Sequence, residues 1–153
     1  MAKVSMLKAF FPSYVTGSPE REGATVDIEH IGYQVPDPVA AAQWYVENLG
    51  LGIARSFGAP AFAQFLADSS GHVMIEIYNN PAAPMPDYRA MSSLVLHLAL
   101  ECPDVEGVRA RLLAAGATAE GDVLHAPSGD TLAMLRDPWG FPVQLARRAS
   151  PMI

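Results

Sequence analysis

The chain has 153 residues, of which half are hydrophobic and 17% are charged, and its formal net charge is −6. This composition excludes a disordered chain, and the length predicts one ordinary domain or two small modules that share a core. The negative charge argues against nucleic acid or an anionic membrane surface as partners. A single cysteine, Cys102, excludes an internal disulfide framework and indicates a reducing, cytoplasmic setting.

The N-terminal segment, residues 1–25, lacks the long apolar run of a signal peptide and is interrupted by Pro12. Nowhere does an apolar run reach the length of a membrane span. We therefore expect residues 1–25 to form an extension outside the folded core, and we expect no membrane partner.

The first recognisable unit covers residues 26–80 and begins with an extended stretch over 28–35. A helix is expected next, because Asp37 suits the N-cap, Pro38 suits the first helical position and Gly50 suits the stop. Three more extended stretches then follow, at residues 51–57, 61–67 and 72–80.

A proline-rich linker, residues 81–92, leads into a second unit over 93–148. This unit again begins with an extended stretch, over 94–100, and its helix is bounded by Asp104 and Gly116. Three extended stretches and a short tail complete the chain, at residues 117–125, 131–136, 141–148 and 149–153.

The two units repeat at a nearly constant offset. His30 and His97 are 67 positions apart, and Glu76 and Gln144 are 68 positions apart. Such agreement indicates a duplicated β-α-β-β-β unit. We therefore predict an α+β fold in which two tandem β-α-β-β-β modules form a cupped mixed sheet.

Side chains alternate along a strand, and this alternation assigns residues to faces. His30 and Glu76 fall on the face of the first sheet that lies opposite its helix, and His97 and Gln144 take the same face in the second module. The residues expected on the helix sides are Ile31, Tyr33, Val35, Val73, Ile75, Ile77, Leu94, Leu96, Leu98, Leu100, Val143 and Leu145.

A single histidine or glutamate on a half-polar strand face usually just meets solvent. Four such residues at matching repeat positions favour a shared role instead. Two imidazoles, a carboxylate and an amide oxygen predict a divalent-metal site that keeps open positions for water or substrate. The residues expected to line the substrate pocket are Gln34, Phe62, Phe65, Tyr78 and Trp139.

Five stretches carry a family resemblance: "IEHIGYQV", "WYVENLGL", "VMIEIYNN", "LHLALEC" and "DPWGFPVQL". Through them the chain resembles the vicinal oxygen chelate superfamily, which includes glyoxalase I, methylmalonyl-CoA epimerase, extradiol dioxygenases and bleomycin- or fosfomycin-resistance proteins. The resemblance covers residues 26–148. It implies a homodimer with a cleft that holds Zn, Ni, Co, Mn or Fe(II) and chelates a small substrate through adjacent oxygens.

The metal ligands that the resemblance implies are His30, Glu76, His97 and Gln144, although many members carry Glu where this chain has Gln144. The function expected is lyase, isomerase or epimerase chemistry, in which the metal polarises a carbonyl and stabilises an enediolate. That chemistry needs a carboxylate base. Gln144 cannot accept a proton, so Glu76 is expected to be both a ligand and the catalytic base.

Two alternatives stay open. His30, His97 and Glu76 also form a two-histidine, one-carboxylate set, which would suit an Fe(II) ring-cleaving dioxygenase. An acidic protein with an aromatic-lined groove would also suit a resistance-type role, in which a drug is sequestered without catalysis.

Overall fold

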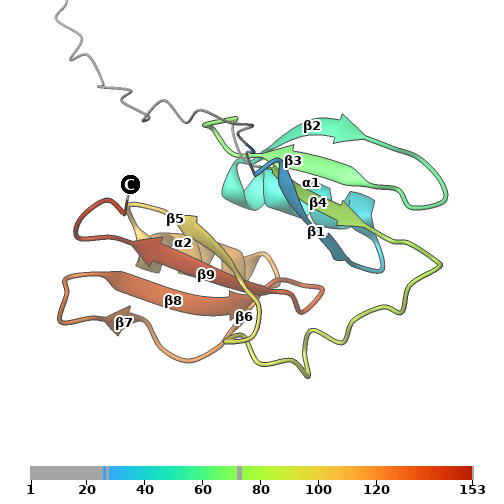
Figure 1. Cartoon of the computed structure of the whole chain (residues 1–153). Helices are drawn as coiled ribbons and strands as arrows, with labels where there is room; N and C mark the ends of the chain where they lie inside the picture. The colour runs from blue at the N-terminus through green and yellow to red at the C-terminus, as the bar shows by residue number, and fades with distance from the viewer. Residues whose placement is uncertain (1–25, 27, 72–73, 153) are drawn as a thin grey trace, which may run out of the picture.

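The computed structural model describes residues 26, 28–71 and 74–152, so the expected extension over 1–25 and Val73 lie outside the described residues. The helices and strands follow one another as expected of a duplicated unit (Figure 1). The first module contains β1 (His30–Gln34), α1 (Pro38–Leu49), β2 (Gly52–Ser56), β3 (Gln64–Ala67) and β4 (Met74–Tyr78). The second contains β5 (Leu98–Glu101), α2 (Val105–Ala114), β6 (Thr118–Ala119), β7 (Leu124–His125), β8 (Thr131–Arg136) and β9 (Pro142–Arg147).

Each module forms one mixed sheet with its helix on one face (Figure 1). The first sheet has the order β1-β4-β3-β2, with β1 and β4 parallel. The second has the order β5-β9-β8-β6, with β5 and β9 parallel and β7 paired to β8. The predicted α+β fold of two β-α-β-β-β modules is thus confirmed. One expected strand, over 117–125, is split into β6 and β7 around Gly121, whose φ is +82°.

Both helices begin and end where the capping residues predict. Asp37 and Asp104 each accept a hydrogen bond from the backbone N–H three residues further on, at 3.0 and 2.9 Å. Gly50 and Gly116 adopt the left-handed conformation at φ +73° and +96°, which a glycine reaches without steric cost. Across the part of the chain that the structure describes, no helix combines the length and apolarity needed to cross a membrane.

The two modules share one hydrophobic core. The indole nitrogen of Trp44, on α1, donates to the carbonyl of Ala115 at the end of α2, at 2.8 Å. The rings of Tyr33 and Phe141, one from each module, stack with their centroids 3.9 Å apart. The helix-side residues that the structure confirms as buried are Tyr33, Val35, Ile75, Ile77, Val143 and Leu145.

The strand expected over 94–100 is only partly formed, because β5 begins at Leu98. Ser92 starts a turn instead: its hydroxyl accepts a hydrogen bond from the N–H of Leu94 at 3.2 Å. Leu94 is 87% exposed, so its expected place on the helix side is wrong. The physical reason is the partner strand, since β9 begins at Pro142 and offers no ladder to the residues before Leu98.

Candidate functional site

The first module brings His30 and Glu76 together. They lie on the adjacent strands β1 and β4, and His30 Nε2 is 3.6 Å from Glu76 Oε2. Gly32, paired with Glu76 in the ladder, leaves room for the carboxylate, because a Cβ at this position would lie 2.9 Å from Oε2. The two side chains keep 34% and 23% of their surface exposed, so the pair is open to a ligand.

The imidazole of His30 is held on two further sides. Its Nδ1 contacts the carboxylate of Glu29, and its ring meets the ring of Phe65 edge-on at 5.3 Å. Phe65 in turn meets Phe57 edge-on at 5.9 Å. The predicted pocket residue Phe65 therefore lies beside the His30–Glu76 pair, and this face of the first sheet combines a polar pair with an aromatic wall.

His97 lies just before β5 rather than inside a strand. Its Nδ1 is 2.8 Å from the carbonyl oxygen of Ser93. It borders a cavity of about 60 Å³ whose other lining residues are Ile31, Gly32, Tyr33, Ile75, Leu96, Leu98 and Phe141. The side chains that β1 and β4 contribute there have the opposite parity to His30 and Glu76, so His97 approaches the first sheet from its other side. Ile31 is 51% exposed at this edge, although it was expected on the helix side.

Gln144 lies half-buried on β9, paired with Ala99 of β5 and Met134 of β8. Ala99 and Gln144 lie side by side in this ladder, whereas His97 stands before the first residue of β5. Among the described residues, no group of three His, Cys, Asp or Glu side chains is arranged to hold a metal ion. Within one chain His30 and Glu76 therefore lie together, and His97 does not complete a three-donor group with them.

The donor set and its placement lead to different conclusions about a metal. Imidazole, carboxylate and amide donors are chemically suited to a divalent cation. Their placement in a single chain does not fit one, because His30 and Glu76 alone leave most coordination positions unfilled. We therefore derive no reaction step through a metal bound to one chain.

Tyr78 and Gln34, two further residues predicted to line the pocket, lie in different surroundings. Tyr78 lies on β4 beside Gly32, with a ring carbon 3.2 Å from where a Cβ of Gly32 would stand. Gln34 is only 5% exposed, and its amide is used within the chain. It donates to the carbonyl of Pro84 at 3.2 Å and accepts from the N–H of Asn80 at 2.7 Å. Gln34 thus fastens the connecting segment instead of presenting its amide to a substrate.

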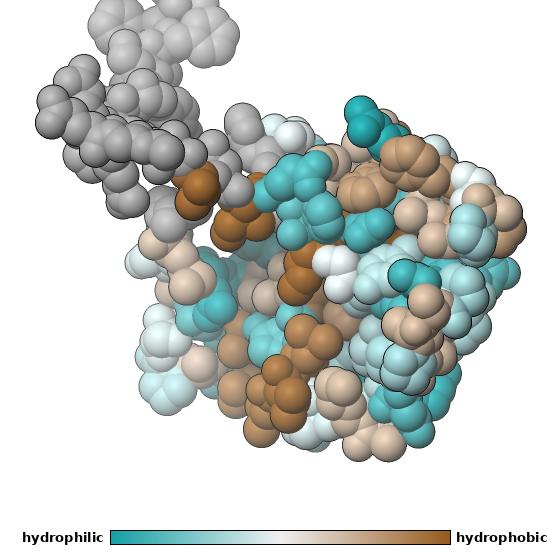
Figure 2. Space-filling view, turned by 45° about the vertical axis from the view of Figure 1, so that its right-hand side comes forward, coloured by the Kyte–Doolittle hydropathy of each residue, from teal (hydrophilic) through white to brown (hydrophobic). Residues whose placement is uncertain are grey.

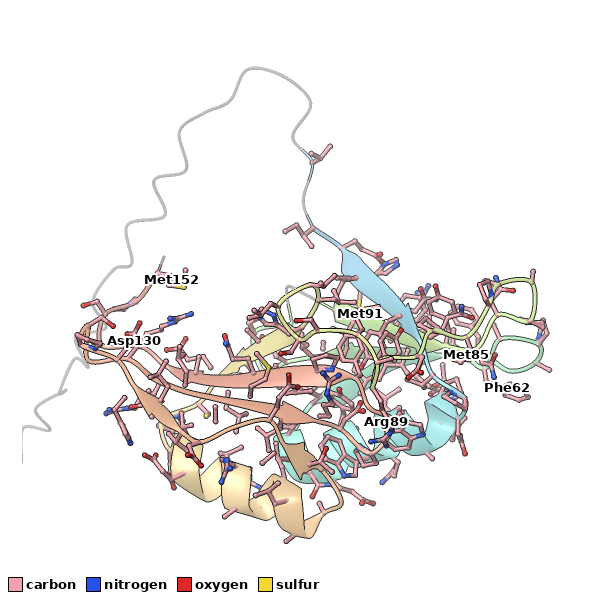
Figure 3. All side chains as sticks on the ribbon, turned by 90° about the horizontal axis from the view of Figure 1, so that it is seen from below. Phe62, Met85, Arg89, Met91, Asp130 and Met152 are labelled. Carbon is pink, nitrogen blue, oxygen red and sulfur yellow. The ribbon has the colours of Figure 1, made fainter. Side chains whose placement is uncertain are left out.

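Phe62 and Trp139 do not extend the aromatic wall beside His30. Phe62 lies in the loop between β2 and β3 with φ +49°, at the outer end of the first module near Met85 (Figure 3). It borders a depression of about 370 Å³ that contains neither His30 nor Glu76. Trp139 lies in the turn before β9 and packs against the core. Both residues were predicted from their aromatic chemistry, which does not indicate where a loop or turn carries a side chain.

Sequence reasoning missed the role of Asp137, which appeared only as the first residue of the stretch "DPWGFPVQL". It is 1% exposed, and burial raises the pKa of its carboxyl to about 6. Its oxygens accept hydrogen bonds from the N–H groups of Trp139 and Phe141 and from the hydroxyl of Tyr45, at 2.9, 2.8 and 3.1 Å. A buried carboxyl therefore joins α1 of the first module to the β8–β9 turn of the second. Tyr45, on the buried face of the first helix, was the feature of the sequence that could have indicated Asp137, because a buried hydroxyl needs a hydrogen-bond partner.

A larger cleft between the modules was also missed. It measures about 920 Å³ and lies at the end of β5, where Glu101, Cys102, Arg111 and Arg147 border it. Burial raises the pKa of the Cys102 thiol, so the reactive thiolate is disfavoured at neutral pH. Only the packing of one module against the other creates this cleft, and no local pattern marks it.

Solved structures provide independent comparisons. The protein SMU.1112c is 26% identical, with a TM-score of 0.61 over 80% of this chain and 99% of that one. TnmS3, an antibiotic binding protein from Streptomyces sp. CB03234, is 22% identical, with a TM-score of 0.64 over 83% and 99% of the two chains. A glyoxalase family protein from Bacillus cereus is 16% identical, with a TM-score of 0.72 over 84% and 98%. The last two comparisons bear on the fold alone.

The family assignment rests on a match to the sequence. No curated protein matches this chain. The family model described as Glyoxalase/Bleomycin resistance protein/Dioxygenase superfamily matches residues 27–145, which cover most of both modules. The chain therefore belongs to the Glyoxalase/Bleomycin resistance protein/Dioxygenase superfamily.

Proposed function

We propose that this protein is a homodimeric, divalent-metal-dependent enzyme that acts on a small substrate with adjacent oxygen atoms. In this proposal His30 and Glu76 of one copy face His97 and Gln144 of a second copy, and the four residues share one ion of Zn, Ni, Co, Mn or Fe(II). The observation that carries it is the 3.6 Å approach of His30 Nε2 to Glu76 Oε2 on an open sheet face. Two donors held together in this way supply half of a metal site.

Two features support completion by a second copy. Within the described residues β1 and β5 are edge strands of their sheets, and edge strands can pair with another chain. Apolar side chains gather on one face of the molecule (Figure 2). The large apolar residues that are at least 70% exposed include Val26, Ile28, Leu94 and Val95. Exposed apolar surface of this kind marks an interface, and a twofold dimer is the commonest way to cover it.

The chemistry we propose is proton abstraction next to a carbonyl group, as in a lyase, isomerase or epimerase. A divalent ion bound in such a dimer would supply Lewis acidity toward the carbonyl oxygen. Glu76 is the only carboxylate among the four donors, so it is the group that can accept the proton. Phe65 and Phe57 would limit water on one side of the substrate. A cytoplasmic location belongs to the same proposal.

Mixed dimers test whether the site is shared. His30→Ala and His97→Ala chains are prepared separately, each measured for bound metal, and then unfolded and refolded together. Each variant alone should lose the metal, whereas the mixture should regain about a quarter of the wild-type metal content, because half of the dimers then hold one intact site of two. A refolded mixed dimer without metal would contradict a shared site.

The metal itself has a separate test. Wild-type protein purified without chelator should contain stoichiometric metal, and its melting temperature should rise with at least one of Ni, Co, Mn or Zn. Absence of both effects would exclude the metalloenzyme proposal. If metal binds, oxygen uptake with catechols by the Fe(II)-loaded protein would favour the ring-cleaving dioxygenase instead.

A second candidate is a resistance-type protein that sequesters a ligand without catalysis. It is favoured by the neutral side chain of Gln144, and by the lack of a three-donor group among the described residues of one chain. TnmS3, described as an antibiotic binding protein, has the same fold. Retention of two histidines and a carboxylate at the repeat positions makes the metal-dependent enzyme the preferred proposal.

A further inference from the structure

Arg136, at the end of β8, holds the segment that connects the two modules. Its Nη1 donates to the carbonyls of Tyr88 and Gly140 at 2.5 and 3.1 Å, and its Nη2 donates to the carbonyl of Met91 at 2.9 Å. Figure 3 shows Met91 on this segment, which runs from the first module to the second. The side chain of Arg136 is 13% exposed, and its Nε forms an ion pair with Glu120 Oε2 at 2.9 Å. The fork of a guanidinium suits several simultaneous acceptors, which an ammonium cannot match.

The contacts continue from Glu120 to His97. The other carboxylate oxygen of Glu120 accepts a hydrogen bond from the hydroxyl of Ser93 at 2.8 Å. Ser93 is 5% exposed, and its carbonyl oxygen is 2.8 Å from His97 Nδ1. An unbroken path of short polar contacts therefore links Arg136 to the imidazole of His97, and every member of it belongs to the second module.

The last contact determines which ring nitrogen of His97 carries hydrogen. A backbone carbonyl can only accept a hydrogen bond, so Nδ1 must be the donor. In the neutral ring the lone pair is then on Nε2. A nitrogen held in this state can bind a metal ion or accept a proton, and the hydrogen bond at the other nitrogen sets the orientation of the ring.

We propose that Arg136, Glu120 and Ser93 are positioning residues that hold His97 in its Nδ1–H tautomer and leave Nε2 as a free acceptor. Arg136 and Glu120 act by fixing the turn that carries the Ser93 carbonyl. The use of Nε2 as a ligand rests on the proposed function, whereas the tautomer is a property of the metal-free chain. The two ideas can therefore fail separately.

The test is a long-range ¹H–¹⁵N correlation spectrum of metal-free protein with ¹⁵N-labelled histidine, recorded near pH 8.5 in the presence of chelator. The chain has four histidines, and a His97→Asn variant assigns the signal. In the wild-type protein the ratio of the Nδ1–H form to the Nε2–H form should be roughly fivefold higher than in free histidine, the shift expected from one ordinary hydrogen bond. In Arg136→Lys and Glu120→Gln the ratio should move to the value of free histidine, in which the Nε2–H form predominates.

Matched controls use ion pairs outside the path. Arg148→Lys weakens the pair with Asp130, and Glu106→Gln weakens the pair with His125, so neither should change the signals of His97. Glu120→Gln keeps an acceptor for Ser93, so it decides the question if Arg136→Lys proves unfolded by its backbone amide spectrum.

Three outcomes would decide the inference. A ratio of Nδ1–H to Nε2–H in the wild-type protein that is no higher than in free histidine would overturn the assignment of the tautomer. An unchanged ratio in a folded Glu120→Gln variant would overturn the role of the path. A retained Nδ1–H form in a protein that binds no metal would support the inference and remove the proposed function.

Discussion

The two modules share one architecture but hold their polar donors differently. In the first, His30 and Glu76 lie on neighbouring strands and approach to 3.6 Å. In the second, His97 precedes its strand and is fixed by the carbonyl of Ser93, while Gln144 carries no charge. The proposed donors thus occupy matching repeat positions, but only the first module has a carboxylate among them. Similar folds therefore do not imply equal contributions to a shared site.

The helices differ in a related way. On α1 the buried residues are Pro38, Ala41, Ala42, Trp44 and Tyr45, whereas on α2 they are Val105 and Leu112. The additional burial on α1 comes with hydrogen bonds into the second module, through Trp44 and Tyr45. The helix of the first module therefore joins the two modules through buried aromatic side chains, whereas α2 reaches the first module through Arg111, which donates to the carbonyl of Asn48 at 3.2 Å.

The largest effect on activity is expected from removing the carboxylate of Glu76, whose counterpart in the second module is the neutral Gln144. Glu76→Gln makes the two modules alike, and it should abolish turnover and weaken metal binding on the order of 100-fold, because it removes both the charge and the base. Metal titration followed by calorimetry and a turnover assay measure the two effects. Glu106→Gln, an exposed glutamate on α2, is the control. Full turnover in Glu76→Gln would remove the functional difference between the modules.

The next effect concerns the joint between the modules. Burial raises the pKa of Asp137 to about 6, above its ordinary value of 3.8, so ionisation of this group opposes folding. Its contribution to stability is complete below about pH 4 and is lost as the pH rises through about 6. Relative to Asp137→Asn, the wild-type protein should lose up to about 3 kcal/mol of unfolding free energy between pH 4 and pH 7.5.

Urea denaturation of both proteins across this pH range measures the difference. Asp130→Asn is a control of opposite sign, because the N–H of Ala149 and the guanidinium of Arg148 lower the pKa of Asp130. Asp130 therefore stabilises the protein above its unfolded pKa, and the contribution is lost as the pH falls through its folded pKa. Parallel pH curves for the wild-type protein and Asp137→Asn would show that Asp137 ionises in the folded protein as readily as in the unfolded chain.

The smallest effect is expected from adding a negative charge at position 144 of the second module. Gln144→Glu gives the second module the carboxylate of the first, and it should strengthen metal binding by about tenfold, because a charged oxygen replaces a neutral one. Calorimetric titration with Ni or Co measures the change. Met134→Leu, at the paired position on β8, controls for altered packing. A weaker metal affinity in Gln144→Glu would place residue 144 outside the coordination sphere.

Most of the fold could be predicted from local patterns. The caps Asp37 and Asp104 and the stops Gly50 and Gly116 mark both helices correctly, since these signals act within one turn of a helix. Alternation also placed His30 and Glu76 on one face, because the pleat of a strand is a local property.

The errors arose where local patterns met a long-range contact. The apolar residues from Leu94 onward predict a strand, yet the ladder with β9 begins only at Leu98. The aromatic ring of Phe62 suits an apolar pocket, but its loop carries it to a different depression, which contains neither His30 nor Glu76. Gln34 lies on a predicted polar face and is nevertheless buried by the connecting segment.

The sequence by itself determined the duplicated unit, the helix ends and the matching repeat positions of the four residues predicted as donors, because periodicity, capping and repeat spacing are encoded by neighbouring residues. The tertiary structure decided which donors meet. The packing of Trp44 against Ala115 and of Tyr33 against Phe141 sets one module on the other, and this places His97 away from His30 and Glu76. No pattern within either module contains that placement, since it depends on the complementary shapes of two surfaces far apart in the chain.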